Sequence, residues 1–423
     1  MFFLSRLLRH MVRFGRLEVT GPTGRVYVFQ GRKDGPPGAA AAPRSAIRVH
    51  DRLTALKLAL WPRLAFGEAY MDGRLTIESG ELYDFIDLCA ANYWSYATHP
   101  LTKLWHGLGW TMRRLAQVNP VRRARRNVAH HYDLSDELYS LFLDNDRQYS
   151  CAYFADPNDG LDLAQENKKR HIAAKLLLKP GMRVLDIGCG WGGLALTLAE
   201  QYGVEVLGVT LSEHQVEVAR RRVQAKGLDG RVRFELWDYR QVDGRFDRIV
   251  SVGMFEHVGV PHYREFFGRL RDMLKPDGVA LLHSIGCMTG PHPLDPWISK
   301  YIFPGGYIQG LSEVLPAVER CRLYVTDIEL LYPHYADTLK AWRNRFKASR
   351  QRAIELYDER FCRMWEFYLA CSELAFRRLN HMVFQMQLTR DPFAVPATRD
   401  YIHTGERAAK RQRPTLVPDR AAS

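Results

Sequence analysis

The sequence lacks any apolar run close to the roughly 20 residues that a membrane-spanning helix needs. The apolar stretches of the N-terminus, MFFLSRLLRHMVRFGRLEV, are interrupted by arginines and are too short for the apolar region of a secretory signal peptide. The seven cysteines are scattered and form no CxxC pair, so neither a zinc site nor a thioredoxin-like motif is predicted, and no metal is expected. We therefore expect free thiols in a reducing compartment, and a cytoplasmic protein.

The charge of the chain is unbalanced. There are 60 lysines and arginines against 47 aspartates and glutamates, which gives a formal net charge of +13. Such an excess favours an anionic partner: nucleic acid, an acidic membrane surface or an acidic substrate. A protein with a merely basic surface is the alternative, and charge alone does not choose among these. A predicted helix over residues 99–126 ends in an arginine cluster, which is either a solvated face or a segment that faces an anion.

The N-terminal segment has the spacing of an amphipathic helix. Leu4, Leu7, Leu8 and Met11 recur at helical intervals, with arginines between them. A basic amphipathic helix of this kind is able to lie in a membrane interface. The pattern is equally typical of a helix whose apolar face packs on the protein's own core.

Three parts are predicted along the 423 residues. Residues 1–125 contain a hairpin pattern over 16–30 and indicate a small N-terminal α+β domain. In residues 126–395, strands alternate with helices from about position 160, which is typical of a doubly wound, mainly parallel sheet; the part after position 333 is largely helical. The fold class is therefore α/β and Rossmann-like, with helical insertions. Residues 396–423 are predicted to form a basic, disordered tail.

The most informative motif is VLDIGCGWGG, residues 184–193, in which a predicted strand ends in a glycine turn that opens a helix. Its GxGxxG spacing also fits a dinucleotide fingerprint, so NAD is the rival ligand. Asp186 would face an incoming pyrophosphate, whereas its charge favours the ammonium group of a methionine-derived ligand. The next strand ends without an acidic residue for a ribose, and Trp237-Asp238 is suited to stack on and hydrogen-bond an adenine. The motif therefore favours S-adenosylmethionine over NAD.

Further chemistry-bearing residues stand at strand ends or in loops. Glu256 follows the fourth predicted strand and His283 ends the fifth, so both are expected to point into the ligand crevice at the carboxyl edge of the sheet. Cys151 and Tyr335 lie in the loop stretches QYSCAYF and PHY. A single cysteine or histidine is more often a packed core residue, but a set that converges on one edge is better explained as a site.

These stretches resemble the cyclopropane-fatty-acyl-phospholipid synthase family, which includes the mycolic acid cyclopropane synthases. The resemblance covers nearly all of residues 127–345, and GEAYMDG at 67–73 resembles the smaller N-terminal domain of the longer bacterial members. The combination of QYSCAYF, MFEHVG and LLHSIG is highly specific, whereas DIGCGWGG alone is not. The other matching stretches are HHYDLSDELYSLFLD, GVTLSEHQ, FDRIVSVGMFEHVG, DPWISKYIFPGG and PHYADTLKAW. The Pro/Ala-rich loop at 36–43 and the basic tail lie outside the family pattern.

The resemblance implies a set of residues that hold S-adenosylmethionine. They are Tyr149, Ser150, Gly188, Gly190, Thr210, Leu211, Gln215, Trp237 and Asp238. Together with Asp186, Trp191 and Gly192 of the glycine turn, they make up the predicted cofactor site.

The resemblance also implies an active-site bicarbonate ion. The matching residues are Cys151, Glu256, His283 and Tyr335, with the backbone of Ile285. Cys371 matches a cysteine once favoured in the family as a nucleophile, but the chemistry needs no thiolate, and a packed helical cysteine is the preferred interpretation. Tyr153 and Phe154 are expected either to stabilise a cation or to line an acyl channel.

The implied enzyme transfers a methylene group from S-adenosylmethionine to the cis double bond of an unsaturated acyl chain in a membrane phospholipid and forms a cyclopropane fatty acid. Methyl-branched or methylene products, or another lipid acceptor, are the alternative, and the sequence separates these poorly. The basic charge then predicts peripheral contact with the anionic inner face of a membrane. A homodimer formed through the N-terminal domain is compatible with the family.

Two other classes of function fit the sequence less well. A nucleic-acid methyltransferase would suit the basic charge, but the sequence has no Asp/Asn-Pro-Pro-Tyr-like motif and no Pro-Cys nucleophile, so no nucleic acid is expected as a partner. A non-catalytic lipid-binding protein is disfavoured because the Cys/Glu/His/Tyr set is complete.

Overall fold

The computed structural model describes residues 1–33, 43–99, 135–291 and 294–411. The predicted helix over 99–126, its arginine cluster, most of the Pro/Ala-rich loop and the predicted boundary at 125/126 lie outside the described residues. Within them, no helix is long and apolar enough to cross a membrane.

The N-terminal part is a four-stranded sheet covered by helices on one face. The strand order is β2-β1-β3-β4, with β1 antiparallel to β2, which confirms the predicted hairpin. Leu4, Leu8 and Met11 of the first helix are buried in the core, whereas Phe2 and Phe3 are exposed. The amphipathic N-terminus therefore uses its apolar face for its own domain. The elements are α1 (Phe2–Met11), β1 (Arg16–Thr20), β2 (Val26–Gln30), β3 (Arg44–Val49), α2 (Arg52–Leu60), α3 (Pro62–Met71), β4 (Leu75–Ser79), α4 (Leu82–Ala91) and α5 (Tyr93–Ala97).

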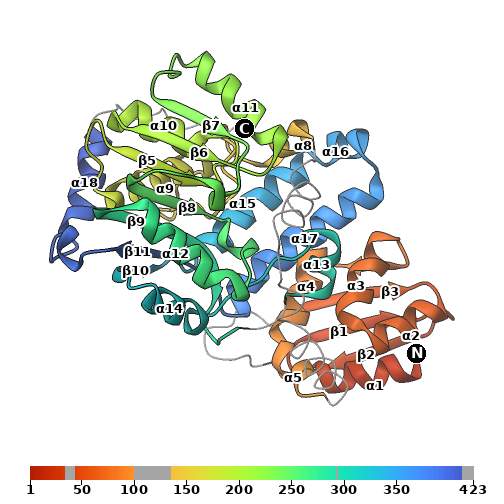
Figure 1. Ribbon diagram of the computed structural model, residues 1–423. Helices are drawn as coiled ribbons and strands as arrows, with labels where there is room; N and C mark the ends of the chain where they lie inside the picture. Colours follow the sequence, from red (N-terminus) through yellow and green to blue (C-terminus); the bar gives the residue numbers. More distant parts are fainter. Residues whose placement is uncertain (34–42, 100–134, 292–293, 412–423) are drawn as a thin grey trace.

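The larger part is built on a seven-stranded sheet of order β10-β11-β9-β8-β5-β6-β7 (Figure 1). Strands β5 to β9 are parallel, as predicted, and β11 is antiparallel to both of its neighbours. The strands are β5 (Arg183–Ile187), β6 (Glu205–Val209), β7 (Val232–Glu235), β8 (Phe246–Val252), β9 (Leu274–Cys287), β10 (Tyr324–Leu330) and β11 (His381–Thr389). β11 interrupts a region that the sequence indicated as helical.

Helices cover both faces of this sheet because its strands are apolar on both sides. In β5, Val184 packs with α9, α10 and α11, and its neighbour Leu185 packs with α12 and α14. The helices are α8 (Asp136–Phe142), α9 (Leu161–Leu176), α10 (Gly193–Tyr202), α11 (Glu213–Ala225), α12 (Tyr263–Met273), α13 (Pro296–Tyr301), α14 (Leu311–Arg320), α15 (His334–Ala348), α16 (Arg350–Leu356), α17 (Glu359–Arg378) and α18 (Asp400–Arg411), with short 3-10 turns η1 (Tyr239–Gln241), η2 (Phe255–His257), η3 (Val260–His262) and η4 (Pro392–Ala394).

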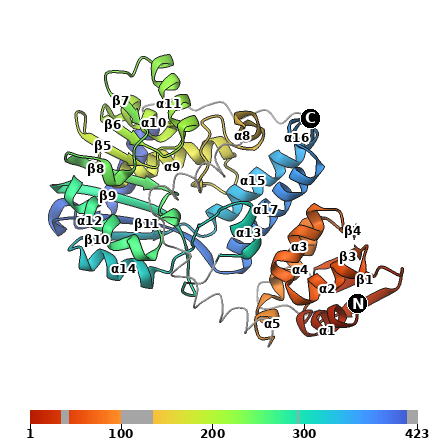
Figure 2. The same cartoon turned by 45° about the vertical axis from the view of Figure 1, so that its right-hand side comes forward.

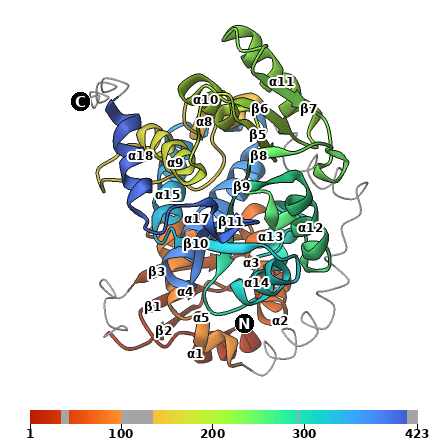
Figure 3. The same ribbon diagram turned by 60° about the vertical axis from the view of Figure 1, so that its left-hand side comes forward.

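The C-terminal tail differs from its prediction. Residues 400–411 form helix α18, which lies beside α9 (Figure 3). Ile402 is buried, and Glu406 Oε1 lies 2.5 Å from Nδ1 of His171 in α9. The prediction of disorder was wrong for this segment, because the basic composition gave no sign of one apolar contact, through Ile402, and one partly buried ion pair, between Glu406 and His171.

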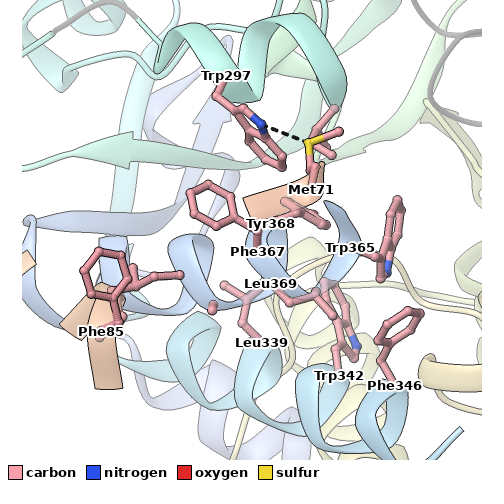
Figure 4. Close-up of a cluster of buried hydrophobic side chains, with 14 of the residues drawn as sticks. Met71, Phe85, Trp297, Leu339, Trp342, Phe346, Trp365, Phe367, Tyr368 and Leu369 are labelled. Carbon is pink, nitrogen blue, oxygen red and sulfur yellow. Dashed lines mark hydrogen bonds between the residues drawn. The ribbon is translucent and has the colours of Figure 1, made fainter. Parts of the chain in front are cut away.

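The two parts share one continuous hydrophobic core, although they look separate in the ribbon (Figure 2). Trp297 of α13 is fully buried and donates a hydrogen bond from its indole to Sδ of Met71, at 3.2 Å (Figure 4). A Cβ at Gly67 of α3 would lie 2.3 Å from that indole nitrogen, so only glycine permits this approach. Phe85 of α4 and Phe367 of α17 belong to the same cluster. The N-terminal part therefore packs directly against the larger one.

Candidate active site

Two cavities meet at the carboxyl ends of the parallel strands. The first, of about 160 Å³, surrounds the glycine turn after β5. The second, of about 770 Å³, runs from the sheet edge to the N-terminal part. Tyr149, Ser150, Gly253 and His257 line both cavities, so a molecule in one abuts a molecule in the other.

The first cavity brings together the predicted cofactor residues. Of the twelve, all line it except Gly192. A Cβ at Gly192 would lie 2.5 Å from the ring of Phe234, and its φ is +82°, so this glycine serves packing and the start of α10. Gly188, with φ +84° and Met254 close to where its Cβ would be, lets the backbone turn beneath the cavity.

Asp186 places a buried carboxyl group beside the first cavity. Its Oδ2 is buried and has no hydrogen-bond partner among the described residues. Burial raises the pKa of Asp186 to about 7, and the nearby Lys168 ammonium opposes that rise. A cationic ligand group in the cavity would satisfy this oxygen and stabilise its charge.

Lys168 of α9 is a lining residue that the sequence did not reveal. Its ammonium is completely buried and donates to Gln148 Oε1 at 2.7 Å and to Ser150 Oγ at 2.9 Å. Burial lowers the pKa of Lys168 to about 8, and the carboxylate of Asp144 partly offsets this. In the sequence it stands in the run KKRHIAAK, which looks like a solvated helix face.

The other end of the first cavity carries the residues predicted for the adenosine. Thr210 donates to Gln215 Oε1 at 3.0 Å, and both are buried. The ring of Trp237 is partly exposed at the edge. Both carboxylate oxygens of Asp238 already accept from Arg240, at 2.8 and 2.7 Å, so a bond to an adenine would share this carboxylate with an arginine.

The second cavity brings together all six predicted catalytic residues: Cys151, Glu256, His283, Ile285, Tyr335 and Cys371. Tyr153 and Phe154 do not line this cavity. Tyr153 stacks on His171, at a distance of 4.3 Å between ring centroids, and the rings of Tyr153 and Phe154 each stack on His334.

Glu256, in turn η2, is held by the strand beside it. The Ile285 amide donates to Glu256 Oε1 at 2.6 Å, so this amide holds the glutamate rather than facing the cavity alone. Glu256 Oε2 is buried and accepts no hydrogen bond from the described residues. Burial raises the pKa of Glu256, and the bond from Ile285 only partly offsets that rise.

His283 lies within β9, which continues to Cys287 rather than ending at the histidine as predicted, and its imidazole favours the neutral form. Burial lowers its pKa well below the usual value, and the ammonium groups of Lys168 and Lys175 lower it further. Its Nδ1 lies 3.2 Å from the amide nitrogen of Gln385 on β11. Gln385 was missed because its strand was not recognised.

The two site cysteines are thiols, not thiolates. Burial raises the pKa of Cys151 and of Cys371 well above the usual value. Cys151 Sγ donates to the Ala152 carbonyl at 3.3 Å, and Cys371 lies on α17 in the cavity wall. This environment does not support the nucleophile role for Cys371.

The seven-stranded sheet with one antiparallel strand, and a glycine turn that presents a buried carboxylate, define an S-adenosylmethionine-dependent methyltransferase. Because the second cavity is mainly apolar, it suits an apolar acceptor of the methyl group. The chain belongs to the mycolic acid cyclopropane synthetase family, whose model matches residues 120–386.

Relatives at the level of sequence agree with this. The chain is 41% identical over 327 residues to the cyclopropane-fatty-acyl-phospholipid synthase of Escherichia coli (strain K12), and this alignment covers 77% of this chain and 83% of that protein. It is 36% identical over 385 residues to a tuberculostearic acid methyltransferase of Mycobacterium tuberculosis, which covers 85% of this chain and 86% of that protein.

Solved structures have the same catalytic fold. Mycolic acid cyclopropane synthase CmaA1, complexed with SAH and CTAB, gives a TM-score of 0.60 at 35% identity and covers 64% of this chain and 99% of its own. The cyclopropane synthase MmaA2 from Mycobacterium tuberculosis gives a TM-score of 0.60 at 34% identity, with the same coverage.

Proposed function

We propose that this protein transfers a methylene group from S-adenosylmethionine to the cis double bond of an unsaturated phospholipid acyl chain, forming a cyclopropane fatty acid. The observation that carries the proposal is the junction of the two cavities. A long, mainly apolar cavity opens beside the cofactor cavity at Tyr149 and Ser150, and buried polar groups gather at that point. An alkene has no polar handle, so only such a shaped apolar site is able to present it to a methyl donor.

The first cavity fits S-adenosylmethionine. The unpartnered carboxylate oxygen of Asp186 suits the ammonium of the methionine part. The Thr210–Gln215 pair, Trp237 and Asp238 line the end assigned to adenosine. With these two ends so placed, the sulfonium of a bound S-adenosylmethionine would lie towards the junction with the acyl cavity, away from water.

The second cavity also fits an anion such as bicarbonate. Glu256 and His283 are buried. Burial raises the pKa of Glu256 and lowers the pKa of His283, which favours the neutral form of each, and a neutral carboxyl or imidazole is able to donate a hydrogen bond. Tyr335 lines the same wall, and the thiol of Cys151 stays protonated. A bound bicarbonate would supply a base for the proton that leaves the new methyl group.

The chain's own residues shape the rest of the reaction. Methyl transfer to the alkene leaves a cation on the neighbouring carbon, and loss of a proton from the new methyl closes the ring. The aromatic side chains of Tyr149, Phe303 and Tyr335 line this cavity, and an aromatic ring is able to stabilise a cation. The buried walls exclude water, which would otherwise capture it.

Membrane contact and homodimerisation belong to the same proposal. The net charge of +13 supports docking on anionic headgroups, and high salt is then expected to lower turnover on anionic vesicles. Sedimentation of the purified chain tests the dimer.

Mass spectrometry of total fatty acids tests the function, in a host rich in unsaturated phospholipids with and without the full chain. A gain of one CH2 with loss of the double bond, and a ring confirmed by fragmentation, is the expected result. Methyl-branched or methylene products would keep the methyltransferase and overturn the product. An unchanged lipid profile from a chain that binds S-adenosylmethionine would contradict the lipid acceptor.

A further inference from the structure

The end of the acyl cavity that lies in the N-terminal part carries a single cationic side chain. Arg63, near the start of α3, is the only lysine or arginine among the described residues that line this cavity. The opposite end carries Glu256 and His283. Between the two ends, the walls are largely apolar and include Phe66, Phe85 and Leu374.

We propose that Arg63 binds the phosphate of the phospholipid substrate and so sets which end of the lipid enters the cavity. The inference rests on the proposed function and adds to it a headgroup site. A phospholipid has an anionic phosphodiester at one end and an apolar chain at the other, and the cavity has the same order of polarity. Arginine suits phosphate because its planar group donates two parallel hydrogen bonds.

Arg63 is held in place from one side only. Its Nε donates to Asp295 Oδ2 at 3.0 Å. Asp295 Oδ1 accepts from the Trp297 amide at 2.9 Å at the start of α13. The two terminal nitrogens of Arg63 make no hydrogen bond to any residue that the structure describes. The aspartate therefore fixes the guanidinium while its outer edge stays available to a ligand.

The side chains around Arg63 are of the types that proteins place near lipid headgroups. Tyr93, Trp94 and Tyr96 line the same cavity, and Trp94 is 57% exposed. Trp61, two residues before Arg63, is 49% exposed, and α2 leads to it with exposed Leu53, Leu56 and Leu60. Tryptophan and tyrosine favour the boundary between hydrocarbon and water. An arginine among them lies at the depth at which a phosphate is found.

The test compares two lipids of which only one carries the anionic phosphoglycerol headgroup. The full-length chain is assayed at saturating S-adenosylmethionine with dioleoylphosphatidylglycerol and with dioleoylglycerol, each in neutral detergent micelles. The readout is the ratio of kcat/KM for the two lipids. Arg63→Ala is expected to lower this ratio by about 10-fold or more, through KM for the phospholipid. Arg63→Lys is expected to keep part of it, because a point charge still attracts phosphate.

A matched variant separates this role from domain attachment. Arg360→Ala removes the ion pair with Asp72, at 2.8 Å, which also joins α17 to the N-terminal part but lies outside the cavity lining. Its ratio is expected to equal the wild-type ratio. If Arg63→Ala lowers kcat/KM for both lipids equally, or for neither, the inference is overturned. A wild-type chain that binds S-adenosylmethionine and converts neither lipid would instead contradict the proposed function.

Discussion

The side-chain amide of Gln385 lies 3.2 Å from Nδ1 of His283, and the two residues are paired across β11 and β9. An amide nitrogen donates hydrogen bonds and does not accept them, so Nδ1 of His283 is the acceptor and the hydrogen of the neutral ring is on Nε2. The buried imidazole is thereby kept neutral in one tautomer that donates from Nε2. Gln385 is thus a positioning residue, because it acts through His283.

Gln385→Glu is expected to reverse this arrangement. A carboxylate accepts from Nδ1, which favours the protonated imidazolium and raises the pKa of His283. We expect kcat to fall about 10-fold near neutral pH and its pH profile to change, with little change in S-adenosylmethionine binding. Gln387→Glu alters a buried glutamine on the same strand that bonds to Tyr401 instead, and should cost stability without a change of profile. A wild-type profile in Gln385→Glu would disprove the positioning role.

Glu256→Gln tests the carboxyl group that would hold the proposed anion in the acyl cavity. The amide oxygen of glutamine still accepts from Ile285, so the fold and cofactor affinity are expected to persist. Turnover is expected to fall by about 100-fold or more, because an amide is a weaker hydrogen-bond donor to the proposed anion than a carboxyl group. Quench-flow or end-point lipid analysis measures the loss, and calorimetry with S-adenosylmethionine is the control. Full turnover in this variant would remove Glu256 from the chemistry.

Asp186 predicts a pH dependence of cofactor affinity. Its pKa of about 7 in the ligand-free protein means that the carboxyl is increasingly protonated as the pH falls through that value. The ammonium of S-adenosylmethionine prefers the ionised form, so affinity should weaken from about pH 8 to about pH 6. Asp186→Asn should bind about 10- to 100-fold more weakly, with a flat pH profile. Calorimetric titration across this range measures both, and an unaltered slope in the variant would contradict the assignment.

The arrangement of strands and the cofactor residues could be predicted because they follow local rules. Strand periodicity and the glycine turn place Asp186 and Gly188 at the sheet edge without knowledge of distant contacts. The role of Gly192 was less visible, since its close neighbour Phe234 lies about forty positions away in the chain. A fingerprint motif does not say which of its glycines faces the ligand.

Features that depend on long-range packing could not be read from the sequence. The burial of Lys168 depends on Gln148 and Ser150, and a lysine in a polar run gives no sign of it. Ile285 was expected to offer its amide to an anion, but the fold brings Glu256 to it first. The acyl cavity has part of its wall in the N-terminal part, which no motif of the catalytic part indicates.

Helix α18 is expected to dock most firmly in a limited pH range. Burial alone lowers the pKa of His171, but its bonds to Glu329 and Glu406 outweigh this and raise it. The stability that His171 contributes is therefore fully present below pH 6.5, the pKa of the unfolded histidine, and is lost as the pH rises through the raised pKa of the folded state. The bond to His171 lowers the pKa of Glu406 despite burial, so that contribution is lost at acid pH.

A double-mutant cycle of His171→Gln and Glu406→Gln measures this pair. The coupling energy from thermal unfolding should be about 1–3 kcal/mol near pH 6 and smaller near pH 9. Lys175 and His403 also contact these carboxylates, so each pH is compared within its own cycle. Equal coupling at both pH values would show that the pair is not ionic.

Gly67 is expected to control both stability and lipid turnover, because α3 approaches α13 at this position. In Gly67→Ala the new Cβ would lie 2.3 Å from the indole nitrogen of Trp297, so the helices must separate, at a cost of about 1–3 kcal/mol. Gly268→Ala in α12 is the matched control: nothing lies within 4 Å of its Cβ, and helix propensity should stabilise it by about 0.5–1 kcal/mol.

The same displacement should reach the acyl cavity. Phe66, next to Gly67, and Phe367, which packs on Trp297 at a ring distance of 4.7 Å, both line it. KM for the lipid is therefore expected to rise in Gly67→Ala, whereas the affinity for S-adenosylmethionine, whose cavity α3 does not line, should stay unchanged. Steady-state kinetics and thermal unfolding measure the two effects. A destabilised variant with wild-type KM would show that the N-terminal part supports the fold without shaping the lipid site.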